Sequence, residues 1–158
     1  MMLSRSILNA ATSVALTLAS ATAAYADVTV MEPWVRGTVA SQKSTGAFMQ
    51  LTTTEAVRLV EVKSGAAKIV EVHEMRMEGD RMMMKAVPGI DVVPGQTLEL
   101  KPGGYHVMLI DVVKPLNAGD KVPLTLVLEG KDKKRIQVEI SAEVRALNAM
   151  PAAQQHQH

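Results

Sequence analysis

The chain has 158 residues, with 17 basic and 16 acidic side chains and no cysteine. This length suits a single domain whose core needs no disulfide, and the near-neutral charge provides no basic surface for nucleic acid or an anionic membrane. The lack of cysteine excludes a thiolate nucleophile, a Cys-based zinc site and a Cys-ligated blue-copper centre.

Residues 1–26 have the pattern of a secretory signal peptide. Arg5 supplies a positive start, Ile7–Ala19 carries no charge, and Ala24-Tyr25-Ala26 forms a small-x-small cleavage pattern. A short membrane anchor is the alternative, which we disfavour because the apolar stretch is shorter than the ~20 residues of a spanning helix. We therefore expect an exported protein that does not span a membrane after cleavage.

The rest of the chain alternates β-branched and apolar runs with turn signals rich in Gly, Pro, Asn and Asp. This pattern predicts an all-β fold, an antiparallel β-sandwich, for a domain over residues 27–146. A tail over 147–158, which includes Met150, His156 and His158, shows no strand pattern. The predicted strands are Val28–Met31, Ala47–Thr53, Val57–Val62, Ile69–Met77, Arg81–Val87, Thr97–Leu100, Tyr105–Val113, Val122–Glu129 and Arg135–Val144.

Two of the four histidines lie in predicted strands, and each has methionine at even spacing. Met75 and Met77 follow His73, and Met108 follows His106. Residues two apart in a strand share one face, so each of these strands presents an imidazole beside a thioether.

A two-residue turn at Gly79-Asp80 predicts a β-hairpin in this region. Its register would place Met77 opposite Met82 and Met75 opposite Met84, with His73 diagonal to Met84. Met83 would point to the other face, where we expect it to pack.

Imidazole and thioether are both neutral, and thioether sulfur is soft, so this donor set selects Cu(I) over hard cations. The pattern does not decide which of Met75, Met82 and Met84 would be a ligand. The competing interpretation is an exported β-sandwich adaptor whose methionines fill the core of a chain with one Trp, two Tyr and one Phe.

The spacing of these residues resembles the signature of the periplasmic copper chaperones of the PCuAC family: His, ten residues, Met, twenty-one residues, then His-x-Met. His73, Met84, His106 and Met108 match it without a gap. Similar pieces flank the signature, namely Pro33-Trp34-Val35-Arg36, Thr45-Gly46-Ala47-Phe48-Met49, Leu100-Lys101-Pro102-Gly103-Gly104-Tyr105, and Gly119-Asp120 with Val122-Pro123-Leu124.

The resemblance implies a cupredoxin-like, Greek-key β-sandwich in the periplasm that binds one Cu(I) through His73, Met84, His106 and Met108. It implies a binding and transfer protein and not an enzyme. Its partner would be a copper-accepting protein, such as the copper-centre subunit of cytochrome c oxidase or another copper chaperone. Met75 and Met82 stay open as alternative ligands, and the tail with His156 and His158 is a further candidate, for Cu(II).

Three other functions are alternatives to copper transfer. A cupredoxin-type electron carrier would need the missing Cys, and the chain cannot itself perform thiol exchange near oxidase assembly. A general copper-tolerance protein would use the same site with another acceptor. For Trp34, the default role is core packing.

Overall fold

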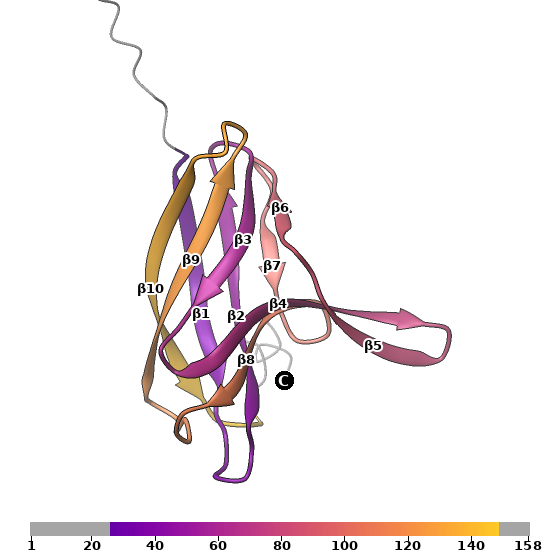
Figure 1. The fold of residues 1–158 in the computed structure, drawn as a ribbon, viewed down its shortest axis with the longest axis vertical. Coiled ribbons are helices and arrows are strands. Elements are labelled where there is room, and N and C mark those ends of the chain that lie inside the picture. The colour runs from indigo at the N-terminus through magenta and orange to yellow at the C-terminus, as the bar shows by residue number, and fades with distance from the viewer. Residues whose placement is uncertain (1–25, 149–158) are drawn as a thin grey trace, which may run out of the picture.

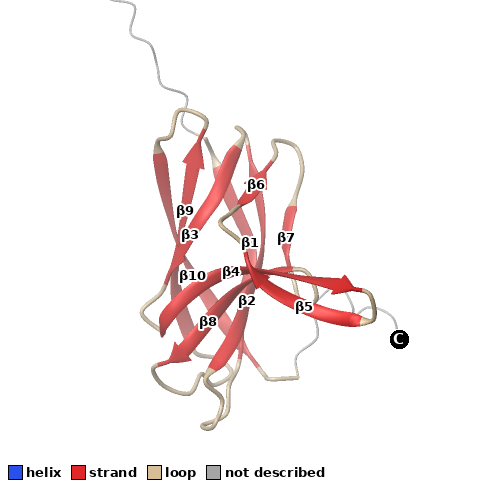
Figure 2. Cartoon of the chain, turned by 45° about the vertical axis from the view of Figure 1, so that its right-hand side comes forward, coloured by secondary structure: helices blue, strands red, loops and turns tan. Residues whose placement is uncertain are grey.

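The computed structural model describes residues 26–148. All of the predicted signal peptide except Ala26 and most of the predicted tail, including His156 and His158, lie outside that range. The described part is built from strands and turns alone (Figure 2). It contains no helix that is long and apolar enough to cross a membrane. Its ten strands are β1 Val28–Arg36, β2 Ser44–Thr53, β3 Val57–Lys63, β4 Ala67–Glu78, β5 Arg81–Ala86, β6 Ile90–Val92, β7 Leu98–Leu100, β8 Tyr105–Val112, β9 Lys121–Gly130 and β10 Arg135–Arg145.

The strands join in the order β5-β4-β8-β2-β1-β10-β9-β3-β6, and β7 pairs with β2 off this path. Figure 1 shows these strands wrapped around one elongated body. The all-β sandwich prediction is confirmed. The structure adds one parallel pairing, between β1 and β10, to an otherwise antiparallel arrangement.

The core follows from the two-residue period of the strands. In β9, Val122, Leu124, Leu126 and Leu128 are two residues apart and almost completely buried, and of the positions between them only Val127 is also buried. Each such side chain contributes about 1.5–3 kcal/mol when it leaves water. This packing gives the body a rigid inner layer on which the outer strands are held.

The two largest differences from the sequence prediction concern β1 and β6. The first strand was expected to end before Pro33, but β1 continues to Arg36 because a bulge between Met31 and Trp34 takes the proline out of the ladder. Glu32 has φ of 48° at that bulge. The short strand β6 was missed, since three residues are too few to reveal an alternating pattern.

The hairpin of β4 and β5 projects from the body, as Figures 1 and 2 both show. The first part of β4 pairs with β8 from Ala67 to Glu74, and the outer part pairs with β5 from His73 to Glu78. His73 therefore lies at the root of the hairpin, where β4 exchanges one partner strand for another.

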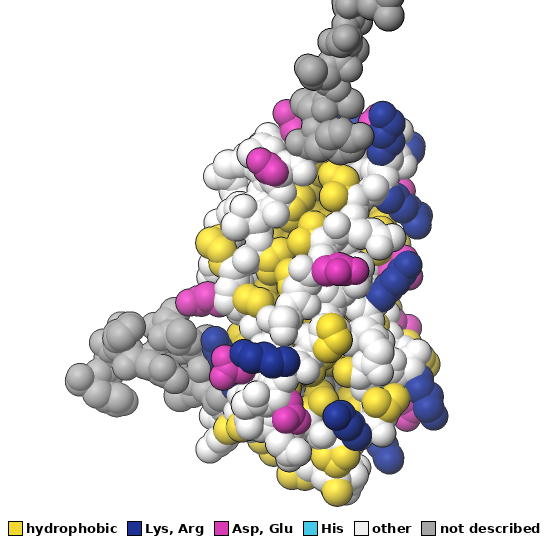
Figure 3. Space-filling view, turned by 90° about the vertical axis from the view of Figure 1, so that its left-hand side faces the viewer, with side chains coloured by type: hydrophobic (Ala, Val, Ile, Leu, Met, Phe, Trp, Pro, Cys, Tyr) yellow, Lys and Arg dark blue, Asp and Glu magenta, His cyan; other side chains and the backbone are white. Residues whose placement is uncertain are grey.

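The opposite side of the body has a different character. Figure 3 shows scattered hydrophobic side chains among Lys, Arg, Asp and Glu, and no histidine of the described residues is visible there. The hairpin, with His73 at its root, projects from the other side of the body (Figure 1).

Candidate metal centre

Antiparallel pairing of β4 with β8 brings the two strand histidines together. His73 and His106 are direct register partners, and their ring centroids lie 5.9 Å apart in an edge-on arrangement. In the same register Met108 faces Glu71. Opposed residues of an antiparallel pair share a face, so both histidines, Met108 and Glu71 occupy one surface of the sheet.

The hairpin adds the remaining thioethers. Met75 faces Met84 and Met77 faces Met82, which confirms the register predicted from the Gly79-Asp80 turn. His73 pairs with Ala86, so Met84 is its diagonal neighbour, also as predicted.

A pocket of about 360 Å³ collects most of the predicted ligands. Met84, His106 and Met108 line it together with Met75, whereas Met82 lies one opposed pair farther out on the hairpin. His73 does not line the pocket, but its ring adjoins that of His106. Of the alternatives that the sequence left open, the structure thus places Met75 at the pocket and Met82 outside it.

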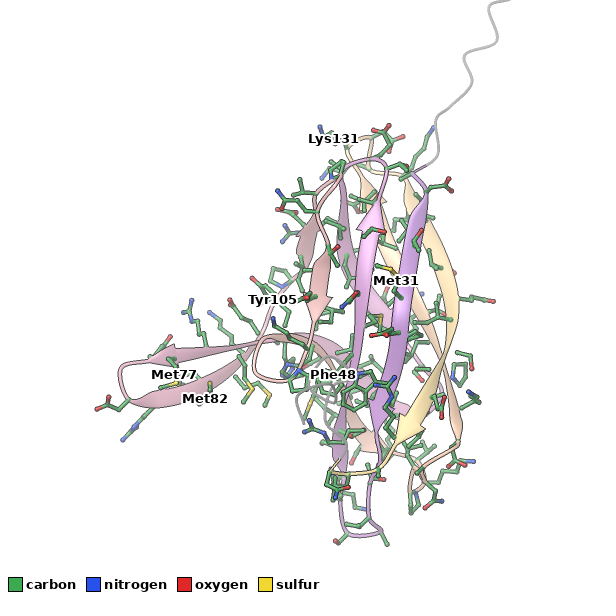
Figure 4. All side chains as sticks on the ribbon, turned by 180° about the vertical axis from the view of Figure 1, so that it is seen from behind. Met31, Phe48, Met77, Met82, Tyr105 and Lys131 are labelled. Atoms are coloured by element: carbon green, nitrogen blue, oxygen red, sulfur yellow. The ribbon has the colours of Figure 1, made fainter. Side chains whose placement is uncertain are left out.

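A larger pocket lies elsewhere in the described residues. It has a volume of about 500 Å³, and Ala56, Lys131 and Ile136 are among the residues that line it. Its lining includes no His or Met. Figure 4 shows Lys131 at the end of the body far from Phe48, which lines the smaller pocket. Size is therefore a poor guide here, and the donor chemistry identifies the smaller pocket as the candidate site.

His106 is held neutral and oriented. Its side chain is buried, and burial is the main cause that lowers its pKa from the ordinary value of 6.5, with the nearby charges of His73 and Arg36 acting in the same direction. A hydrogen bond to the Gly104 carbonyl, 3.1 Å from Nδ1, opposes this effect. Because Nδ1–H donates to that carbonyl, the lone pair of the neutral ring is on Nε2.

The Gly104 carbonyl accepts a second hydrogen bond, from the backbone N–H of Met75 at 3.1 Å. One oxygen thus ties the start of β8 to the root of the hairpin. Gly103 has φ of +85°, a left-handed conformation that favours glycine, and the Pro102-Gly103-Gly104 turn brings His106 beside the hairpin.

His73 has the complementary arrangement. Its Nε2 lies 2.7 Å from Oε2 of Glu71, whereas its Nδ1 is buried and has no hydrogen-bond partner. With Nε2–H donating to the carboxylate, Nδ1 carries a free lone pair. A buried polar atom without a partner costs about 1–3 kcal/mol, and a metal ion at Nδ1 would remove that cost.

Aromatic rings form the wall behind the histidines. Phe48 lies 6.3 Å from His106 and 4.6 Å from Trp34 between ring centroids. Trp34 is buried one ring behind the pocket, in keeping with its predicted core role. Arg36 packs over Phe48 at 5.4 Å and also lines the pocket.

Sequence reasoning missed Glu71, Phe48 and Arg36. Glu71 had a signal, since it is two residues from His73 and must share its face. Phe48 and Arg36 stand in pieces that resemble the PCuAC family, but no local pattern links them to the site, because they come from β2 and β1, which reach it only through the sheet.

The donor set limits what the site could hold. Among residues 26–148, His, Asp and Glu side chains form no group of three or more suited to a metal ion. Thioether sulfur is the other donor at this pocket, and the combination of two imidazoles with Met84 and Met108 fits a soft monovalent ion.

Comparison with known proteins agrees with this fold. The family described as LpqE-like lipoproteins matches residues 28–140. A lipoprotein of Leifsonia xyli subsp. xyli, Lxx21020, is 32% identical over 100 residues, which is 63% of this chain and 60% of the relative. The chain thus spans less than two thirds of that relative.

Two solved structures match a larger share of both chains than this relative does. The apo PCuAC domain of PmoF2 has a TM-score of 0.61 at 26% identity and covers 79% of this chain and 94% of that domain. The Cu(I) form of DR1885 from Deinococcus radiodurans has a TM-score of 0.55 at 27% identity, over 80% of this chain and 83% of that protein. The chain therefore belongs to the LpqE-like family, and its body is a cupredoxin-like β-sandwich of the PCuAC type.

Proposed function

We propose that this protein binds one Cu(I) ion through His73, Met84, His106 and Met108 and hands it to a copper-accepting partner. The observation that carries the proposal is the direct cross-strand pairing of His73 with His106, next to a pocket that Met84 and Met108 line.

The state of the donors supports this function. His106 has a lowered pKa and a free Nε2 lone pair, and His73 has a buried Nδ1 without a hydrogen-bond partner. Neither imidazole nor thioether has to lose a proton from its neutral form to bind a metal. Four neutral donors leave the single charge of Cu(I) uncompensated, and the Glu71 carboxylate next to His73 supplies a nearby negative charge.

The different exposure of the proposed ligands supports transfer of the copper ion to a partner as opposed to its permanent storage. Met84 is 45% exposed, whereas His106 is only 5% exposed. A partner could therefore replace the Met84 thioether first and the histidines afterwards, with copper held throughout by at least two donors.

The relatives support the same ion and the same setting. The DR1885 structure is of its Cu(I) form, and the family is one of lipoproteins, which points to the cell envelope. Together with the signal-peptide pattern over residues 1–26, this supports the periplasm as the proposed site of action. The acceptor that best suits a PCuAC-type donor is the copper-centre subunit of cytochrome c oxidase.

The test is an anaerobic Cu(I) titration against a competing chelator. The wild-type chain should bind one tight equivalent, and a variant with His106→Ala and Met108→Ala should lose it while its circular dichroism stays that of a folded β protein. A matched control changes Met83 to Ala on the other face of the hairpin. Tight binding that survives in the double variant would overturn the proposal. Transfer to the purified oxidase subunit, measured after separation of the two proteins, tests the acceptor.

A further inference from the structure

The projecting hairpin has two chemically different faces. Opposed pairs on one face are Met75 with Met84 and Met77 with Met82. The other face pairs Glu74 with Lys85, Arg76 with Met83, and Glu78 with Arg81. Of the four β5 residues from 81 to 84, three are methionines, and only Met83 lies on the charged face.

Packing does not explain the methionine face. Every residue of β5 is exposed, and Met77 and Met82 are 58% and 53% exposed. A two-stranded ribbon that leaves the body has no hydrophobic layer to bury such side chains, and polar residues would suit it better. Figure 4 shows Met77 and Met82 together on the hairpin, away from the body that holds Phe48.

The methionine face is continuous with the candidate metal centre. Met75 and Met84 line the pocket with His106, and Met77 and Met82 form the next opposed pair outward. Positions two apart along a strand are separated by about 7 Å, so the outer pair is one such step from the inner ligand Met84.

Thioethers in this arrangement have a clear chemical use. Directly opposed side chains have Cβ atoms about 4.5–5.5 Å apart, which lets two flexible Met side chains converge on one ion. The positions that share this face on the hairpin, residues 73, 75, 77, 82, 84 and 86, include no carboxylate, so hard cations have no ligand there. Sulfur-only donors favour Cu(I).

We propose that Met77 and Met82 form a second, weaker Cu(I) site through which copper leaves the inner site toward the tip of the hairpin. This inference rests on the proposed function. The step is a ligand exchange in which bonds from copper to the inner donors break as bonds to the outer thioethers form. Copper stays Cu(I), and no electron or proton is transferred.

The test follows each methionine separately. The purified chain, labelled with ¹³C in the Met methyl groups, is titrated anaerobically with zero to three equivalents of Cu(I) and observed by NMR. The first equivalent should shift the Met84 and Met108 signals, and further Cu(I) should shift those of Met77 and Met82. Because each Met methyl group gives its own signal, copper bound at Met77 and Met82 can be distinguished from copper bound at the tail.

Two variants complete the experiment. Met77→Leu with Met82→Leu keeps the apolar surface and removes both sulfurs, so the first equivalent should bind as before and release to a chelator should slow several-fold. Met83→Leu, on the charged face, should behave as wild type. If the first equivalent binds but the Met77 and Met82 signals do not move, or if release by the double variant is unchanged, this inference is wrong. If no equivalent binds at Met84 and Met108, the proposed function itself fails.

Discussion

His73 and His106 are directly opposed on neighbouring strands, with ring centroids 5.9 Å apart, and each leaves a different ring nitrogen free. His106 donates from Nδ1 to Gly104, whereas His73 places Nε2 against Glu71 and leaves Nδ1 without a partner. The two free nitrogens are thus set by two different hydrogen bonds, one to the backbone and one to a side chain. This asymmetry makes the two histidines sensitive to different substitutions.

Removal of a thioether ligand should weaken copper binding without unfolding the protein. We expect Met84→Ala and Met108→Ala each to weaken Cu(I) binding by more than about tenfold, or about 1.4 kcal/mol, in a chelator competition. Met84 is 45% exposed, so its truncation leaves no large cavity. Met83→Ala is the matched control, and an equal loss in that variant would contradict the ligand assignment.

Glu71 should act by orienting His73. Groups that hydrogen-bond a ligand histidine typically change metal affinity 10–100-fold, so Glu71→Ala should weaken Cu(I) binding by about tenfold or more. Glu71→Gln keeps an acceptor and should recover part of the loss. The ¹⁵N chemical shifts of the His73 ring should report a changed tautomer in Glu71→Ala alone.

Glu74→Ala is the control for this prediction, because Glu74 is next to His73 but on the other face of β4. Affinity loss of the same size in Glu74→Ala would mean that general charge near the site, and not the Glu71 hydrogen bond, decides the affinity.

The lowered pKa of His106 predicts the pH dependence of the metal-free protein. Burial holds the folded-state pKa below 6.5, so between these two values the unfolded chain binds a proton that the folded chain does not. Stability therefore rises with pH over this window and is lost as the pH falls below about 6.5 toward the folded-state pKa. Urea unfolding at a series of pH values should show this slope in the wild type and a smaller one in His106→Gln. Identical slopes would contradict it.

The aromatic wall of the pocket depends on Gly46. A Cβ at this position would lie 2.6 Å from Cζ of Phe48, whose ring is packed against Trp34. Gly46→Ala should therefore destabilise the fold by about 1–3 kcal/mol, and it should weaken Cu(I) binding because the displaced Phe48 ring is a neighbour of His106.

Gly65→Ala provides the matched control in thermal unfolding and Cu(I) titration, since a Cβ there meets nothing within 4 Å. If Gly46→Ala unfolds and binds copper like Gly65→Ala, the Phe48 ring is not held as tightly as its packing implies.

Local pattern was enough to predict much of the site. The two-residue turn at Gly79-Asp80 determines the hairpin register, so the opposition of Met77 to Met82 and of Met75 to Met84 followed from counting along the chain. Strand alternation also separated Met83 from its neighbours. These relationships depend only on residues within a dozen positions of one another, where backbone geometry leaves few choices.

The pairing of β4 with β8 could not be derived in that way. Residues 74–105 separate the two histidines, and many strand orders would satisfy the same alternating pattern; only the spacing of a known family indicated that His73 and His106 act together. The same holds for Phe48 and Arg36, which enter the pocket from β1 and β2.

The sequence by itself therefore determined the strand content, the hairpin register and the type of donor atoms, because each depends on local backbone geometry or side-chain chemistry. Only the tertiary structure decided which methionines reach the histidines, which ring nitrogen of each histidine is free, and that Met77 and Met82 stand outside the body. Those properties depend on which strands the sheet brings together and on what each side chain then finds within hydrogen-bonding distance.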